Sequence, residues 1–151
     1  MTSLPAAGGY YPPVGFHFKV EFVGLGNDND VRFQSVSGLS VEYDTETFKE
    51  GGENRFEHRL PVRTKYADLG LKRGMLTESE VIRWVLDALQ NRIFKPLDIH
   101  VSLLNESHEP LKTWRVHRAW PKKWSVSDLN AQENSLVVES LDLSFSHFTL
   151  A

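Results

Sequence analysis

The chain has 151 residues, of which 40% are hydrophobic and 25% charged, a composition typical of one globular domain and not of a disordered chain. Its 17 Lys and Arg residues are outnumbered by 20 Asp and Glu residues, and the net charge of −3 gives no general attraction to nucleic acid or anionic lipid. The absence of cysteine excludes disulfides, thiolate metal sites and cysteine nucleophiles.

The N-terminus shows no basic segment followed by an apolar run, and no stretch approaches the ~20 apolar residues that cross a bilayer. We therefore expect synthesis in the cytoplasm without a signal peptide, and no membrane insertion by this chain. Residues 1–13 are rich in Pro, Gly and Ala, which predicts a flexible arm. Residues 14–151 are predicted to form a single domain.

Alternating side chains predict several strands in the first half of the domain. Residues 16–22 alternate strictly between apolar and polar, so that aromatic side chains lie on one face and charged ones on the other. Shorter strands are expected over 31–36, 39–48 and 69–74. The polar, glycine-bearing stretch over 44–60 predicts a long hairpin or a protruding loop.

One helix is expected after this half. Thr77 and Glu80 match a capping box, in which the two side chains satisfy unpaired amides of the first helical turn. Pro96 ends the segment. Five apolar residues recur at helical spacing and predict one buried face: Val81, Trp84, Val85, Ala88 and Leu89.

The second half of the domain again predicts strands. Residues 97–103 alternate cleanly, and 111–120 is their expected antiparallel partner. Pro121 is expected to interrupt the chain before a shorter strand over 124–129, and 136–150 is predicted as the last and longest strand. The sum is a mainly β fold, a β-barrel or two packed antiparallel sheets, with one flanking α-helix.

No catalytic, cofactor or metal site is predicted. Zinc sites need closely spaced ligand pairs, whereas the six histidines are scattered along the chain. The acidic turn at 28–30 fails as a calcium loop because Arg32 occupies a ligand position. The six histidines are His17, His58, His100, His108, His117 and His147. The four tryptophans, which suit either a core or a ligand pocket, are Trp84, Trp114, Trp120 and Trp124.

Three predicted strands carry a hydrophilic face beside a strongly apolar one. Such strands suit a wall with a hydrophobic core behind it and water in front, although an ordinary exposed sheet face gives the same pattern. The polar side chains are His17, Lys19, Glu21, Asp98, His100, Ser102, Ser140, Asp142, Ser144 and Ser146.

Several segments occur in the order and spacing of a known family. They are 33–39 (FQSVSGL) leading into 41–43, then 69–74 (LGLKRG), 102–110, 113–114, 119–123 (AWPKK) and 133–139 (ENSLVVE). Over about 16–148 the chain resembles the inner tail tube proteins of contractile phage tails and phage-like contractile injection systems. The resemblance implies an Hcp-like barrel of two packed sheets and a helix. It also implies hexameric rings that stack into a hollow tube.

By the same resemblance the partners are other copies of the chain, adjacent rings, a trimeric spike, baseplate components and the surrounding sheath, with no specific nucleic acid. The runs 51–61, 63–66 and 123–131 resemble the tube-initiator paralogue, which forms the ring layer next to the spike. The alternatives are a bulk tube protein of the same machine, or a non-assembling β-barrel that binds a ligand.

Two sets of residues are predicted to serve such an assembly. Contacts between stacked rings are expected at Glu50, Glu53, Asn54, Arg55 and Glu57. The lumen is expected to be lined by Lys19, Glu21, Asp98, His100, Ser102, Asp142, Ser144 and Ser146.

Overall fold

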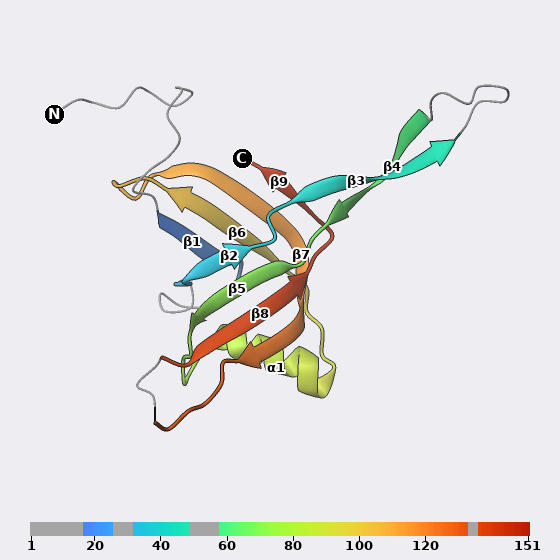
Figure 1. The fold of residues 1–151 in the computed structure, drawn as a ribbon. Coiled ribbons are helices and arrows are strands. Elements are labelled where there is room, and N and C mark those ends of the chain that lie inside the picture. The colour runs from blue at the N-terminus through green and yellow to red at the C-terminus, as the bar shows by residue number, and fades with distance from the viewer. Residues whose placement is uncertain (1–16, 26–31, 49–57, 133–135) are drawn as a thin grey trace.

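The structure, a computed structural model, describes residues 17–25, 32–48, 58–132 and 136–151. The strands are β1 (His17–Phe22), β2 (Ser35–Ser37), β3 (Val41–Phe48), β4 (His58–Tyr66), β5 (Leu69–Gly74), β6 (Leu97–Leu104), β7 (Pro110–Val126), β8 (Val138–Ser144) and β9 (His147–Leu150). The helix described is α1 (Glu80–Asn91). The predicted class, mainly β with one flanking helix, is confirmed (Figure 1).

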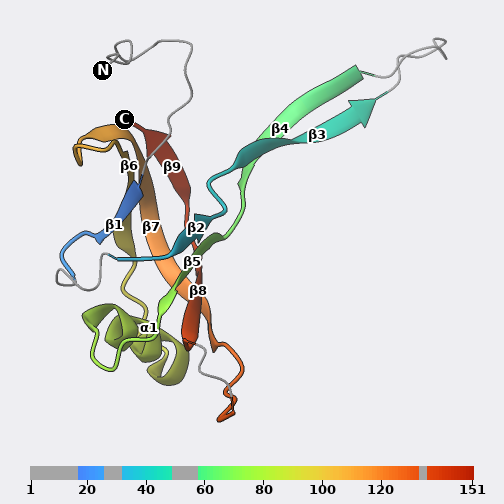
Figure 2. The ribbon, with the colours of Figure 1, turned by 60° about the vertical axis from the view of Figure 1, so that its left-hand side comes forward.

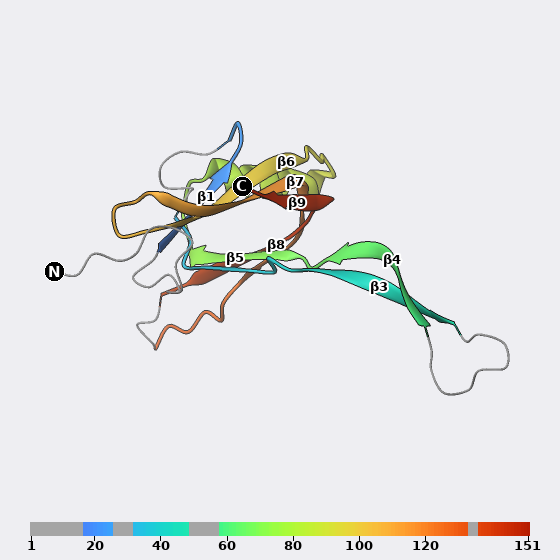
Figure 3. The ribbon, with the colours of Figure 1, turned by 90° about the horizontal axis from the view of Figure 1, so that it is seen from above.

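One long strand, β7, connects two sheet layers. The antiparallel order is β1-β6-β7-β8-β5-β2, and β9 also pairs with β7. β7 pairs with β6 as far as Ala119 and with β8 from Trp120 onward. We call β1, β6, the first half of β7 and β9 layer 1, and the second half of β7, β8, β5 and β2 layer 2. Figure 3 shows the two layers facing each other.

Irregular pairing marks the bend of β7. Its register shifts between Val116 and Ala119, where Arg118 has a positive φ of 57°, and shifts again between Pro121 and Lys123. Such bulges bend a strand, and proline, which lacks an amide hydrogen, is tolerated at them. The predicted break at Pro121 is therefore wrong. The segments 111–120 and 124–129 belong largely to one strand.

The predicted strand over 136–150 is broken in turn. It forms β8 and β9, which both pair with β7 on the two sides of its bend. Between them the Ser146 amide donates to the His117 carbonyl at 3.0 Å. A partner that follows a sharply bent strand must interrupt its own ladder at the bend, a constraint that alternation along 136–150 does not reveal.

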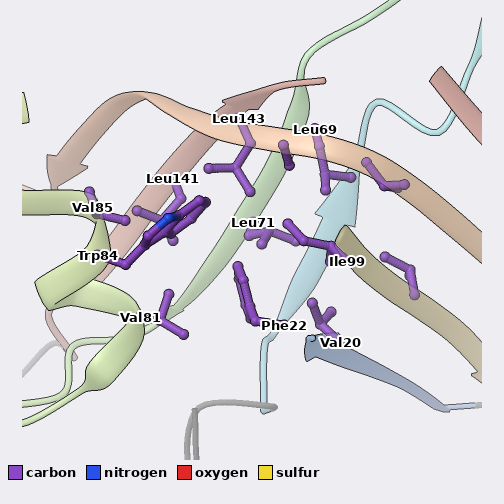
Figure 4. Close-up of a cluster of buried hydrophobic side chains, with 13 residues drawn as sticks. Val20, Phe22, Leu69, Leu71, Val81, Trp84, Val85, Ile99, Leu141 and Leu143 are labelled. Carbon is purple, nitrogen blue, oxygen red and sulfur yellow. The ribbon is translucent and has the colours of Figure 1, made fainter. Parts of the chain in front are cut away.

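The core lies between the inner faces of the two layers (Figure 4). The Phe22 and Trp84 rings meet edge-on at 5.9 Å, so that the helix covers one end of the space between the layers. The Trp84 indole also donates to the Lys95 carbonyl at 2.6 Å. The buried cluster comprises Val20, Phe22, Leu69, Leu71, Val81, Trp84, Val85, Ile99, Val101, Val116, Ala119, Leu141 and Leu143.

Helix α1 differs from its prediction at both ends. Its N-cap is Ser79, whose hydroxyl accepts a hydrogen bond from the Ile82 amide at 3.2 Å, so the predicted cap at Thr77 is wrong. Leu89, predicted on the buried face, is 40% exposed. The described part of the chain holds no helix with the length and apolarity needed to cross a bilayer.

A buried ion pair joins the strands of layer 2. The Arg73 Nε donates to the Glu139 Oε2 at 2.7 Å, and the two side chains are 2% and 1% exposed. Arg73 also donates to the Ser79 hydroxyl at 2.9 Å, and the Trp124 indole donates to the other Glu139 oxygen at 3.2 Å. The Arg73 guanidinium lies 4.8 Å from the centre of the Phe33 ring. The network thus links β5, β7, β8 and the start of the helix.

This network makes a stability prediction. Glu139→Gln removes the countercharge of a buried arginine, and breaking such a pair costs about 3–5 kcal/mol of unfolding free energy. The control, Asp142→Asn, changes a carboxylate on the same strand that faces away from the core, and should cost less than about 0.5 kcal/mol. Urea denaturation of both variants measures the difference. Equal losses would contradict the role given to the buried pair.

Candidate assembly surface

The sheet is open at its edges within the described residues. In layer 2, β2 pairs only with β5 at one edge, and the second half of β7 pairs only with β8 at the other. In layer 1 the outer strands are β1 and β9, each with a single partner strand. Unpaired strand edges present rows of backbone donors and acceptors that readily pair with another chain. The described part of the molecule therefore offers several surfaces for self-association.

A two-stranded hairpin projects from layer 2. β3 and β4 pair only with each other among the described residues and extend away from both layers (Figure 2). Every side chain in them is exposed except the half-buried Tyr66. Five large apolar side chains of the hairpin are exposed to solvent: Val41, Tyr43, Phe48, Leu60 and Val62. An isolated hairpin is marginally stable in water, so this one is suited to receive a covering partner.

The hairpin predicted over 44–60 is confirmed in its described part and is longer than expected, from Val41 to Tyr66. Its connecting residues lie outside the described ones. All five predicted stacking residues, Glu50, Glu53, Asn54, Arg55 and Glu57, fall in that stretch, so their placement stays a prediction.

The base of the hairpin is fixed by close contacts. The Tyr66 ring packs edge-on against Phe145 at 5.6 Å and Phe148 at 5.0 Å. Gly38, between β2 and β3, has a φ of 88°, and a Cβ there would lie 1.9 Å from the Asp68 carbonyl oxygen. Asp68 also accepts from Lys122 Nζ at 2.8 Å, and this hydrogen bond raises the pKa of Lys122. The joint therefore holds the hairpin in a defined direction.

The predicted lumen residues divide between two opposite faces. In layer 1, Lys19 stands opposite Ser102 and Glu21 opposite His100, on the side away from the core. Asp98 belongs to the same face, because it accepts from the Arg118 amide at 3.1 Å beside His117. These side chains therefore lie on the outer face of layer 1, and the core separates them from layer 2.

Two of the remaining predicted lumen residues, Asp142 and Ser144, belong to the other side of the core, and Ser146 lies at the bend between the layers. Asp142 and Ser144 lie on the outer face of layer 2. They alternate along β8 with Leu141 and Leu143, which are buried in the core. Ser146 lies between β8 and β9, where its hydroxyl donates to the His117 carbonyl at 3.3 Å. A single channel cannot be lined by both faces of one sandwich, so only one of the two sets can be lumenal.

Four histidines meet in pairs that sequence spacing did not suggest. His17 Nε2 lies 2.5 Å from His108 Nδ1, and the rings of His117 and His147 stack at 4.5 Å. His58 stacks on Phe48 in the hairpin. Among the residues that the structure describes, no group of three or more His, Asp or Glu side chains is arranged to hold a metal ion.

The tryptophans serve mainly the core. Trp84 belongs to the buried cluster, and Trp114 and Trp124 pack against it. Trp120 instead is 37% exposed. A cavity of about 240 Å³ opens at the base of the hairpin, lined by Ser40, Val41, Glu42, Lys65 and Ala67 and by no tryptophan. It does not match the tryptophan-lined ligand site of the alternative hypothesis.

Residues 14–149 match the model of the T4-like virus tail tube protein gp19 family. The chain belongs to this family. It is a tail tube protein, which is a structural component of a phage tail-like particle and not an enzyme. No curated protein sequence matches the chain.

Several solved structures resemble this tail tube protein over most of its length. A chain of the anti-feeding prophage baseplate, symmetrised six-fold, is 28% identical with a TM-score of 0.82, covering 93% of this chain and 96% of that one. A chain of the PVC sheath–tube complex, an extracellular contractile injection system, is 26% identical with a TM-score of 0.81, covering 100% and 99%. Hcp1 from Flavobacterium johnsoniae shares the fold at 14% identity and a TM-score of 0.51, covering 89% and 94%.

The joint at Gly38 yields a prediction with a matched control. Gly24 also has a positive φ, 82°, but a Cβ there meets nothing within 4 Å. Gly24→Ala should cost about 1–2 kcal/mol from the backbone conformation alone. Gly38→Ala should cost a further ~1–3 kcal/mol, because the hairpin joint must shift away from Asp68. Thermal unfolding compares the two variants. Equal melting temperatures would show that the joint is not tightly packed.

Proposed function

We propose that six copies of this tail tube protein form a ring and that the rings stack into the hollow inner tube of a contractile injection system. The observation that carries the proposal is the open layer 2, which has a free edge on each side and is prolonged by an exposed hairpin. When unlike edges of identical subunits meet head to tail, each contact repeats the same rotation, and six copies close into a ring when that rotation is one sixth of a turn.

The number of copies is supported by the relatives. The six-fold symmetrised baseplate chain matches almost the full length of this chain at 28% identity. A second relative stands within a sheath–tube complex at 26% identity. Partners of the same kind are therefore proposed for this protein: other copies in the ring, adjacent rings, baseplate components and a surrounding sheath.

The lumen is assigned to the outer face of layer 2. Edge-to-edge contact through β2 and the second half of β7 joins layer 2 sheets into a continuous wall, whose core side is already covered by layer 1. Asp142 and Ser144 then face the channel, while Lys19, Glu21, Asp98, His100 and Ser102 face outward. Ser140 and Ser144 place short hydroxyls on that wall, and the exposed Lys72 lies opposite Ser140, so the channel would be hydrophilic.

Within the tube, we propose that this protein forms the ring layer next to the spike. That ring would join the trimeric spike to the rest of the tube. This assignment is supported by the resemblance of 51–61, 63–66 and 123–131 to the initiator paralogue and by the likeness to a baseplate chain. The competing assignment, a bulk tube protein, is supported by the likeness to a chain of the sheath–tube complex.

The first test locates the lumen. Because the chain has no cysteine, Ser140→Cys on layer 2 and Ser102→Cys on layer 1 introduce single thiols at half-buried positions on opposite faces. In assembled tubes, a maleimide carried on a large polymer should modify Ser102→Cys and leave Ser140→Cys unmodified. A small maleimide should react with both.

The control is the unassembled subunit, in which both thiols should react with the large reagent. Electron microscopy and native mass spectrometry of the wild-type protein check that rings of six 17.3-kDa chains form. A concentrated sample that stays monomeric would refute the ring, and the reverse labelling pattern would refute the assignment of the lumen.

The second test counts copies in the intact particle. A spike-proximal layer should contribute one ring, about two copies for each chain of a trimeric spike. A bulk tube protein should exceed the spike many-fold, in proportion to tube length. Quantitative mass spectrometry of purified particles, with labelled peptides from this chain and from the spike, decides between them. A large excess of this chain would exclude the spike-proximal assignment.

A further inference from the structure

An exposed aromatic pair lies beside one free edge of layer 2. The rings of Phe94 and Trp120 meet edge-on at 5.8 Å, yet these residues remain 50% and 37% exposed. The adjacent Ile93 is 49% exposed. Large apolar groups held together at the surface of a folded subunit mark sites of interaction.

The position of this pair relates it to the sheet edge. Trp120 begins the second half of β7 and pairs with Ser144 of β8 on one side. Its other side belongs to the edge that no described strand covers. Phe94 reaches it from the segment between α1 and β6. The pair therefore stands where a strand from another molecule would approach layer 2.

The opposite edge of layer 2 carries its own exposed apolar side chains. There β2 continues through the Gly38 joint into β3, whose first residues include Val41, 48% exposed, and Tyr43, 63% exposed. In a head-to-tail ring, the β2–β3 side of one subunit meets the second half of β7 of the next. The two apolar sites then face each other at every contact.

We propose that Phe94 and Trp120 anchor the contact between neighbouring subunits, where the β2–β3 side of a second copy covers them. The inference rests on the proposed ring. Aromatic residues, tryptophan above all, dominate the binding energy of protein interfaces when a partner removes them from water.

The charges of the hairpin oppose a symmetric alternative. β3 carries Glu42, Asp44 and Glu46, whereas the basic side chains Arg59, Arg63 and Lys65 are on β4. A two-fold dimer formed by pairing β3 with β3 would place like charges against each other, which is unfavourable. The second copy is therefore expected to bring its β7 side, not its own β3, to this edge.

The test is ring formation by Trp120→Ala and Phe94→Ala. Each variant should raise the apparent dissociation constant of the ring by ~30-fold or more, the size of an interface hot spot. Leu111→Ala, which removes an apolar side chain 46% exposed on layer 1, should leave it unchanged. Mass photometry across a dilution series gives the constants, and thermal unfolding of the dilute monomer checks the fold.

A cross-link tests the contact without removing the aromatic pair. Trp120→Cys and Tyr43→Cys are made in separate chains of the cysteine-free protein, mixed, and treated with a short bismaleimide. The expected product is a dimer that contains one chain of each kind. Wild-type rings combined with unchanged ring formation by both alanine variants, or with no mixed dimer, would overturn the proposal. A wild-type protein that never forms rings would instead overturn the proposed function.

Discussion

The architecture depends on the requirement that a single strand, β7, serves both layers. It can do so only by bending, and the bend is built from two bulges, one at the positive φ of Arg118 and one at Pro121. Its partner breaks into β8 and β9 at the same level. Because β6 accompanies only the first half of β7, the second half is left with one free edge in the described structure. The free edge on the β7 side of layer 2 thus follows from the bend.

The core does not depend on those free edges. Inside the sandwich, Arg73 and Glu139 join three strands to the N-cap of the helix, and no buried side-chain polar atom of the described residues lacks a hydrogen-bond partner. The hairpin differs, since both of its faces are exposed. A subunit built in this way folds around its own core and leaves its edges and hairpin for association.

Much of the fold follows from local patterns in the sequence. Alternation located β1 and β6, and helical spacing placed Trp84 in the core. The cap was misassigned because Thr77 and Glu80 satisfy the local capping-box pattern, whereas Ser79, which Arg73 of β5 also engages, is the residue that caps the helix. Alternation also shows that Glu21 and Asp142 point away from apolar neighbours. It cannot show that they do so on opposite sides of the core, because that depends on which strands pair.

The two polar faces differ in a way that fits their proposed surroundings. On layer 1, a row across four strands carries three ionisable side chains, Glu21, His100 and Arg115, and ends at Thr149. Such side chains make directional contacts and suit a surface that must hold a sheath in register. On layer 2, short serine hydroxyls alternate with Asp142 along β8. Across from them, the exposed Lys72 pairs with Ser140 and the exposed Lys123 pairs with Asp142. In the proposed tube, the hydrophobic core of the sandwich therefore separates the polar face toward the sheath from the polar face toward the channel.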